Sequence, residues 1–435
     1  QSGVGIPIIY LVQLGMYHWL TAAVDMLPWY LPRHNPFVLA IGFQQSVYAI
    51  LSFGIGSLIF APLITGLWRN ERGFSPRNKT VTIKKNESLH IPWPQVYFYV
   101  GIIGFFFITP LTSRLPTISA FFSAMGDLMI VGGILLCWLA IRTNNKKRLL
   151  GYLILFALLP VFTTVSSGFL GWGFSFFLLV LIFILRANKR PIGILVIVML
   201  IAYLSVSVFV NYMEARDDIR ASVWGGESLR DRLFTTAESF QNFELFDIYN
   251  NDHLRWFEAR LDQNIFIGMA IERLDNGIVE VANGKTLGDA ATMLIPRILW
   301  PNKPVRLGGA QIISYYTGIP IYGSTTSPTG HVLELYINFK TLGVIIGFVF
   351  IGTLLTIMDE QAAKRLYDQD FSSFAVWFLP ALSLLHPDNN FMVFTAGSIS
   401  ALIFILVFNR FVQILYIPKK STFRVRKQNK SSHKG

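Results

Sequence analysis

Cysteine and charge are both scarce in this chain of 435 residues. The single cysteine, Cys137, excludes an intramolecular disulfide and any metal site built on several cysteine ligands. Charged residues make up 14% of the sequence, whereas soluble domains contain about 25%. Hydrophobic residues reach 53%, and the mean hydropathy is +0.49. This balance indicates an integral membrane protein.

Metal-binding patterns and internal repeats are also missing. The seven histidines are scattered, and no pair of acidic residues has the spacing of metal ligands. We therefore expect neither a metal ion nor another cofactor. Many transporters are built from two related halves, and no such repeat is visible here. A transporter or flippase is therefore a weaker hypothesis than an enzyme.

Long apolar runs are what the sequence does contain. A helix needs about 20 mostly apolar residues to cross the hydrocarbon core of a bilayer. Ten segments are predicted to do so: residues 8–27, 43–67, 93–111, 118–141, 149–166, 169–185, 191–210, 331–358, 371–385 and 391–417. The expected fold class is an all-α polytopic membrane protein with about ten transmembrane helices.

Basic residues predict how these helices are oriented. Twenty-two Lys and Arg residues fall in alternate loops and the C-terminal tail, while the opposite short loops contain only Arg33 and Arg114. The positive-inside rule then places both termini in the cytoplasm. The net charge of +12 is interpreted as a topology signal that also attracts anionic lipid, rather than as a nucleic-acid surface.

One long polar segment interrupts the apolar pattern. We predict transmembrane helices 1–7 in residues 1–210, an external domain in residues 211–330, transmembrane helices 8–10 in residues 331–417 and a basic tail in residues 418–435. The external domain contains eleven basic and fifteen acidic residues. Apolar spacing predicts helices at 227–245, 253–274 and 287–299, and a loop at 305–330.

Two runs in and after this segment resemble a known family. The first is Ile295-Pro296-Arg297-Ile298-Leu299-Trp300-Pro301-Asn302-Lys303-Pro304, and the second is Ser327-Pro328-Thr329-Gly330-His331-Val332-Leu333-Glu334-Leu335-Tyr336-Ile337-Asn338-Phe339, followed by Gly343. Both resemble bacterial O-antigen or oligosaccharide repeat-unit polymerases of the Wzy type, which are related in architecture to O-antigen ligases. The resemblance implies a fold like that of the C-type glycosyltransferases, with a helical external domain over a cavity open to lipid.

The resemblance also implies an activity. Such an enzyme joins undecaprenyl-diphosphate-linked repeat units into an O-antigen, capsule or exopolysaccharide at the outer face of the plasma membrane. Its partners would be these lipid-linked glycans, the lipid bilayer, a chain-length regulator and a flippase. Two alternatives stay open: a ligase that transfers glycan from the lipid carrier to another acceptor, and a polysaccharide transporter or flippase.

This chemistry needs cations that hold a diphosphate, because the charge on the leaving group grows as the glycosidic bond breaks. The predicted diphosphate contacts are Arg216, Arg220, Arg260, Arg297 and Lys303. Arg114 and Lys340 are predicted as additional substrate contacts. Asp127, inside the fourth span, is predicted as a substrate contact or partner of a clamp arginine, with a structural hydrogen bond as the alternative. Each arginine has a simpler interpretation as a solvated or ion-paired loop residue.

The reaction also needs a base that accepts the proton of the attacking hydroxyl. Glu334 and His331 are three residues apart and share one face of a helix at the predicted mouth of the eighth span. Glu334 matches the polymerase pattern. His331 lies where the ligases carry a histidine, but it is followed by Val332 instead of the asparagine of the ligases. The alternative for Glu334 is an ion pair with Lys340 or an arginine.

Overall fold

The computed structural model describes residues 3–71, 91–112, 116–187, 191–292, 295, 300, 302, 308–321 and 329–416. Helices account for 81% of the structure, and the described residues contain no strand. The all-α prediction is therefore confirmed. The elements are α1 (Ile6–Asp25), α2 (Pro36–Ile55), η1 (Gly56–Phe60), α3 (Ala61–Glu71), α4 (Trp93–Ile103), η2 (Gly104–Ile108), α5 (Thr109–Thr112), α6 (Pro116–Arg142), α7 (Lys146–Ala157), α8 (Leu159–Ser167), α9 (Leu170–Ala187), α10 (Pro191–Trp224), α11 (Leu229–Ser239), α12 (Asn251–Leu261), α13 (Asn264–Asp275), α14 (Lys285–Thr292), α15 (Gly309–Thr317), α16 (His331–Tyr367), α17 (Phe371–Leu384) and α18 (Phe391–Leu415).

Six helical stretches among the described residues are long and apolar enough to cross a membrane. They are Ile6–Asp25, Pro36–Leu67, Phe121–Arg142, Lys146–Ser167, His331–Tyr367 and Phe391–Leu415. Three other predicted spans correspond to shorter apolar helices, Trp93–Ile108, Gly173–Leu185 and Phe371–Leu384. The predicted span 191–210 lies in α10, and its side chains before Met199 are outside the described residues. The structure thus supports six of the ten predicted spans at full length.

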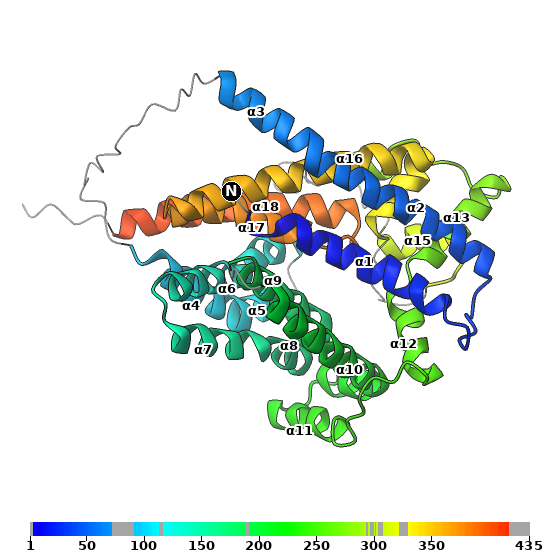
Figure 1. Cartoon of the computed structure of the whole chain (residues 1–435), viewed down its shortest axis with the longest axis horizontal. Helices are drawn as coiled ribbons and strands as arrows, with labels where there is room; N and C mark the ends of the chain where they lie inside the picture. The colour runs from blue at the N-terminus through cyan, green and yellow to red at the C-terminus, as the bar shows by residue number, and fades with distance from the viewer. Residues whose placement is uncertain are drawn as a thin grey trace, which may run out of the picture.

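The helices form two groups that run along the long axis of the molecule (Figure 1). In one group α16 packs against α2 and α17, and α17 packs against α18. In the other, α6 packs against α4, α7 and α9. Contacts of α6 with α17 and α18 join the two groups. The main hydrophobic core, which includes Phe53, Leu128, Phe348 and Phe374, extends through both.

Glycines let α13, from the polar segment, dock directly on α2. A Cβ at Gly42 would lie 2.0 Å from the Asn264 carbonyl oxygen, and a Cβ at Gly268 would lie 2.0 Å from the Val38 carbonyl oxygen. The two backbones therefore touch, as small residues allow in closely packed apolar helices. The Asn264 side chain strengthens the junction with α1, since Nδ2 donates to the His18 carbonyl and Oδ1 bonds His18 Nδ1, both at 2.8 Å. The first part of the polar segment is thus fixed to the apolar helices.

Several predicted boundaries in the polar segment were wrong. The helix predicted at 227–245 is shorter, ending at Ser239, and the one predicted at 253–274 is two helices, α12 and α13, separated at Asp262 and Gln263. The predicted loop 305–330 contains α15, which ends where Gly318 adopts a left-handed conformation (φ 77°). The helix predicted at 287–299 starts earlier as α14, and Thr292 is its last residue.

The eighth predicted span is not one continuous helix. Within α16, Phe339 (φ −143°, ψ 23°) and Lys340 (φ 52°, ψ −152°) leave the helical conformation. A short first part, residues 331–338, is therefore set at an angle to the long second part. The positive φ of Lys340 is unusual for a residue other than glycine, and Asn338, just before the break, bonds outside α16 to Thr286 Oγ1 at 2.6 Å. The kink positions the short part, which carries His331 and Glu334.

Asp262, in the link between α12 and α13, is a buried acid outside the apolar spans. Its Oδ1 accepts a hydrogen bond from the Asn264 N–H at 2.8 Å. Burial, reinforced by the charge of Asp25, raises the pKa of Asp262 from 3.8 to about 7. The native state therefore binds this proton more tightly than the unfolded chain does. The stability gained from the protonated form is complete below pH 3.8 and is lost as the pH rises through 7.

Replacing Gly268 with Ala tests the contact between α2 and α13. The added Cβ would overlap the Val38 carbonyl, and overpacking of this kind costs about 1–3 kcal/mol. We expect G268A to lower the Tm of the purified protein in detergent, followed by tryptophan fluorescence. Gly288→Ala in α14 is the matched control, since no atom lies within 4 Å of a Cβ there. Equal changes in Tm for the two variants would contradict the close contact.

Replacing Asp262 with Asn tests the pH dependence. Asparagine keeps an acceptor for the Asn264 N–H but does not ionise. The Tm of D262N should therefore fall less than the Tm of the wild type when the pH is raised from 5 to 8. The comparison is made by thermal unfolding at both pH values. Asp218→Asn, at an exposed position of α10, should leave the wild-type pH dependence unchanged. A wild-type Tm that is independent of pH over this range would show that Asp262 does not have a raised pKa.

Candidate functional site

The first part of α16 begins inside the protein. Gly330 adopts a left-handed φ of 77° immediately before the helix. The N–H of His331, the first helical residue, donates to the Pro387 carbonyl at 2.8 Å. Pro387 lies in the turn between α17 and α18. This turn ends at Asn390, whose side chain caps α18 by accepting a hydrogen bond from the Val393 N–H. The start of α16 is therefore held against this turn.

Glu334, one of the two predicted bases, is completely buried (0% exposed). Its Oε2 accepts a hydrogen bond from the Phe391 N–H at 2.8 Å, so the carboxylate also fixes the start of α18. Its Oε1 is buried and has no hydrogen bond of standard geometry among the described residues, while the Thr286 hydroxyl lies close enough to interact with the carboxylate. Buried polar atoms are usually paired, and a carboxylate oxygen without such a bond is available to a hydroxyl group brought beside it.

A cavity lies next to this carboxylate. It has a volume of about 390 Å³ and lies between α14, α15 and α16, with Glu334 among the residues that line it. Its lining also includes the charged residues Glu280, Lys285 and Asp289. The volume is in the range of small-molecule sites, about 300–1,000 Å³. Among the described lining residues, Glu280, Asp289 and Glu334 carry carboxylates and Lys285 carries an ammonium group.

Tyrosines and hydroxyl groups complete the lining. Tyr315 and Tyr316 of α15 both line the cavity, with their ring centroids 5.0 Å apart in an edge-to-face arrangement. Thr286 of α14 lines it as well, and its hydroxyl accepts from Asn338 Nδ2 at 2.6 Å. This bond, together with that from the Ala282 N–H to the Ile337 carbonyl at 2.8 Å, ties α14 to the first part of α16. Aromatic faces with neighbouring hydroxyl and carboxylate groups suit a sugar.

His331, the other predicted base, has a different environment. It is completely buried and stacks on Phe391 with ring centroids 4.7 Å apart. Its Nδ1 lies 2.7 Å from the Tyr10 hydroxyl. His331 is not among the residues that line the cavity. The geometry makes it a structural link between α1, α16 and α18, one turn of helix away from Glu334.

Arg220, a predicted diphosphate contact, is mostly enclosed. Its Nε donates to the Gly168 carbonyl at 3.3 Å. The guanidinium lies over Phe169 and Trp224, 4.8 and 5.2 Å from the two ring centroids. These contacts join the end of α10 to the turn between α8 and α9, and they hold the guanidinium in a fixed orientation.

Three of the predicted arginines come together at this place. Burial lowers the pKa of Arg220, and the nearby charges of Arg216 and Arg260 lower it further. Arg216 is partly exposed and pairs with Asp217 at 3.4 Å. Arg260, on α12, is exposed, and the structure gives it no ion pair with another described residue. The cluster of Arg216, Arg220 and Arg260 is called the arginine cluster below.

Tyr17 of α1 links the arginine cluster to the turn between α17 and α18. It lies within electrostatic reach of both Arg260 and Asp388. Asp388 belongs to the turn whose Phe391 N–H binds Glu334. Tyr17 is therefore close both to the arginine cluster and to the turn between α17 and α18, although these parts are far apart in the sequence.

The remaining predicted residues are placed elsewhere. Lys340, at the break in α16, pairs with Asp275 at 3.4 Å and is exposed. Asp127 is half-buried in α6 and does not line the cavity. Arg114, Arg297 and Lys303 lie outside the described residues. Within the described part of the chain, no group of three or more His, Cys, Asp or Glu side chains is arranged to hold a metal ion.

Sequence reasoning missed Lys285, Asp289 and the two tyrosines of the cavity. Asn283 and Gly284 marked a turn there, and both have positive φ, but a turn signal does not say what the next helix faces. Tyr315 and Tyr316 lie in the segment predicted as a loop, so no helical face was assigned to them. Their position follows from the docking of α14 and α15 against α16, which no local pattern reveals.

Comparison with known proteins places the chain in one family. Residues 56–419 match the model of a family described as a domain of unknown function (DUF8712). No curated protein and no solved structure matches the chain. The matched region includes Glu334 and every other residue that lines the cavity. Since the match extends over most of the 435 residues, the chain belongs to the DUF8712 family.

Proposed function

We propose that this protein is a membrane glycosyltransferase that polymerises undecaprenyl-diphosphate-linked oligosaccharide repeat units into a surface polysaccharide. The observation that carries the proposal is the buried carboxylate of Glu334, which lines a cavity of about 390 Å³ and whose Oε1 has no hydrogen bond of standard geometry among the described residues. The resemblance of the runs around Arg297 and Glu334 to repeat-unit polymerases supports it from the sequence. Parts of both runs, 296–299, 301, 303–304 and 327–328, lie outside the described residues.

The proposed setting is the bacterial plasma membrane, with both termini in the cytoplasm and the cavity on the outer side. Six helices long and apolar enough to span a membrane support the membrane setting. The concentration of basic residues in alternate loops supports the orientation. The fold proposed is that of a C-type glycosyltransferase with about ten spans, the shorter apolar helices completing the bundle.

In the proposed reaction the non-reducing-end sugar of one glycan occupies the cavity. Its hydroxyl oxygen attacks the anomeric carbon of the second glycan, and the bond from that carbon to the diphosphate oxygen breaks. Glu334 Oε1 accepts the hydroxyl proton, while undecaprenyl diphosphate leaves with the bonding electron pair. The Phe391 N–H holds Oε2, so the carboxylate is oriented before the sugar arrives. Such positioned bases contribute about 10²–10⁴-fold to rate.

The arginine cluster is proposed to hold the diphosphate of the donor. Arginine forms charge-assisted, bidentate bonds to phosphate oxygens, and such groups stabilise the charge that develops on a leaving group. Arg260 is the member with an exposed guanidinium, whereas the Arg220 guanidinium is already held by Gly168, Phe169 and Trp224. Arg260 is therefore the proposed direct contact, and Arg220 adds positive potential and fixes the end of α10.

The alternatives use the same features in different ways. A ligase would need the same carboxylate and the same cations, with another acceptor in the cavity. A transporter would use the break in α16 at Phe339 and Lys340 as part of a translocation path, and no group would need to accept a proton. The products in cells separate the three functions.

Replacing Glu334 with Gln tests the proposed base. Glutamine keeps an oxygen for the Phe391 N–H but cannot accept a proton, so polymer formation should fall by at least about 100-fold. Lipid-linked and surface glycans are measured in cells that lack the protein and are complemented with each variant. Glu238→Gln, at an exposed position of α11, should restore normal polymer.

The glycans of the uncomplemented cells decide between the functions. Single repeat units left on the carrier or the surface would establish a polymerase. Full-length polymer that stays on undecaprenyl diphosphate would indicate a ligase. Normal polymer with normal attachment would overturn the enzymatic proposal and leave a transporter as the leading hypothesis.

Arg260→Ala tests the proposed diphosphate contact. We expect at least a tenfold loss of polymer, because the developing charge of the leaving group loses its direct cation. Arg260→Lys should retain part of the activity, since lysine supplies the charge without the planar fork. Arg255→Ala is the control on the same helix, as Arg255 is exposed and pairs with Asp252 at 3.0 Å. If the two alanine variants have equal effects on polymer, Arg260 has no special role.

A further inference from the structure

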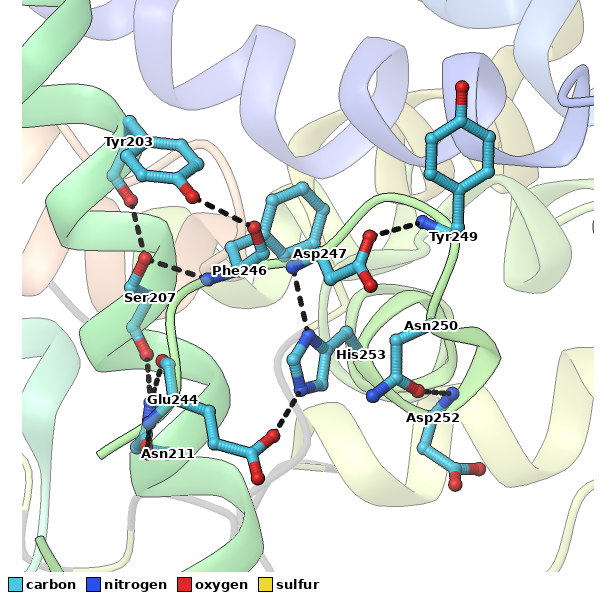
Figure 2. A network of polar contacts seen from close by, with 10 residues as sticks. All are labelled: Tyr203, Ser207, Asn211, Glu244, Phe246, Asp247, Tyr249, Asn250, Asp252 and His253. Carbon is cyan, nitrogen blue, oxygen red and sulfur yellow. Dashed lines mark hydrogen bonds and ion pairs between the residues drawn. The ribbon is translucent and has the colours of Figure 1, made fainter. Parts of the chain in front are cut away.

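A non-helical strap, residues 243–249, connects α11 to α12 and runs beside α10 (Figure 2). Sequence reasoning placed this segment in the external domain, residues 211–330. The residues of α10 that hold it begin at Tyr203, inside the predicted span 191–210.

Three polar side chains of α10 hold the strap. Asn211 Oδ1 accepts from the Glu244 N–H at 3.0 Å, and Asn211 Nδ2 donates to the Glu244 carbonyl at 2.7 Å. Ser207 Oγ accepts from the Phe246 N–H at 2.9 Å, and the Tyr203 hydroxyl donates to the Phe246 carbonyl at 3.1 Å. The three residues are spaced by four, so they form a polar row on one face of the helix, as Figure 2 shows.

This row extends into the apolar stretch of α10. Residues 191–210 contain no charged side chain, and Glu214 is the first acid that follows. At 1.5 Å per residue, Tyr203 lies about 16 Å along the helix from Glu214. Met199, Leu200 and Leu204, at the level of Tyr203, are exposed apolar side chains, as expected where a helix faces lipid. The strap therefore meets α10 at the boundary between its apolar and polar parts.

At this boundary the backbone of the strap is expected to form hydrogen bonds within the protein. In water its backbone groups would be satisfied by solvent, whereas in a bilayer every N–H and C=O needs a partner within the protein. Both backbone groups of Glu244 and both of Phe246 have such partners on α10. The Asp247 N–H donates to His253 Nδ1 at 3.1 Å, and the Tyr249 N–H donates to Asp247 Oδ1 at 2.9 Å.

The strap carries exposed apolar side chains. Leu245 is 54% exposed and Tyr249 is 70% exposed, and the Tyr249 ring points away from the network in Figure 2. Ile248 is exposed as well, and its carbonyl accepts from Trp29 Nε1 at 2.9 Å. The Trp29 and Tyr249 rings lie 4.8 Å apart. Trp and Tyr are enriched where a membrane protein crosses the interface between lipid and water.

The two acids of the strap have partners in the protein. The Glu244 carboxylate lies 3.6 Å from Nε2 of the buried His253, on α12, although its side chain is 66% exposed. Asp247 is exposed as well and accepts from the Tyr249 N–H of the strap itself. The exposed apolar side chains of the strap include Leu245, Ile248 and Tyr249.

We infer that the strap is a membrane-bound element that lies in the boundary between lipid headgroups and acyl chains, with Leu245, Ile248 and Tyr249 in contact with the phospholipid bilayer. The polar row on α10, which begins at Tyr203 inside the predicted span 191–210, and its hydrogen bonds to the backbone of Glu244 and Phe246 argue for lipid as the occupant of this surface. Segments of this kind bury their apolar face about 5–10 Å into the interface. The inference does not depend on the reaction that the protein catalyses.

Spin labels on single cysteines test the inference. The native Cys137 is buried, so a Cys137→Ser background allows one cysteine at a time at Leu245, Ile248 or Gln241. Gln241, exposed and two residues before the strap, is the control. The labelled proteins are placed in phosphatidylcholine–phosphatidylglycerol nanodiscs, and collisions with O₂ and with a water-soluble nickel chelate are compared. We expect a several-fold higher ratio of O₂ to nickel collisions at positions 245 and 248 than at 241.

Two results would overturn the inference. A ratio at positions 245 and 248 equal to that at 241 would place the strap in water. Protection from both reagents would mean that protein, such as a second copy of the chain, covers the surface. Asn211→Leu provides a second measurement, because it removes both bonds to Glu244 at nearly constant size. In this variant the label at 245 should become more accessible to nickel, while the label at 241 should not change.

Discussion

The need of every backbone N–H and C=O for a partner at membrane depth is the constraint on which the rest of this structure depends. Helices satisfy it by themselves, and each place where the chain leaves the helical conformation needs a substitute. At the start of α16 the substitute is the Pro387 carbonyl, and at the start of α18 it is the Glu334 carboxylate. Along α10 they are Asn211, Ser207 and Tyr203. Polar side chains inside apolar helices therefore mark the places where irregular backbone is packed.

Glu334 is both a hydrogen-bond acceptor for the start of α18 and the proposed base. One oxygen is used to hold the start of α18, which fixes the carboxylate, and the other has no hydrogen bond of standard geometry among the described residues. A base held in this way does not have to reorganise when a hydroxyl group arrives. In the proposed reaction the cavity beside Glu334 holds the acceptor sugar and the arginine cluster holds the diphosphate of the donor, so two separate groups of side chains carry the two roles.

The sequence predicted the structure well where composition or the helical repeat alone determines it. Apolar length predicted the positions of the helices, and the helical spacing of His331 and Glu334 predicted that both lie on one short helical part. Sequence reasoning failed where contacts between distant segments determine the local conformation or the lining of the cavity. Lys340 adopts a positive φ although nothing in the residues around it signals a break, and α15 forms in a stretch rich in Gly, Ser and Thr. Lys285 and Tyr316 became cavity residues only because α14 and α15 dock on α16.

The strap has a consequence for the proposed diphosphate site. It leads directly into α12, and Arg260 lies nine residues after Asn251, about 14 Å along that helix. If Leu245 and Ile248 contact lipid, the start of α12 is fixed at the membrane interface. A lipid-linked diphosphate is restricted to the height of the headgroups, because its hydrocarbon chain stays in the bilayer. Anchoring α12 to lipid would then hold Arg260 at a constant height relative to that diphosphate, which thermal motion of a free external domain would not allow.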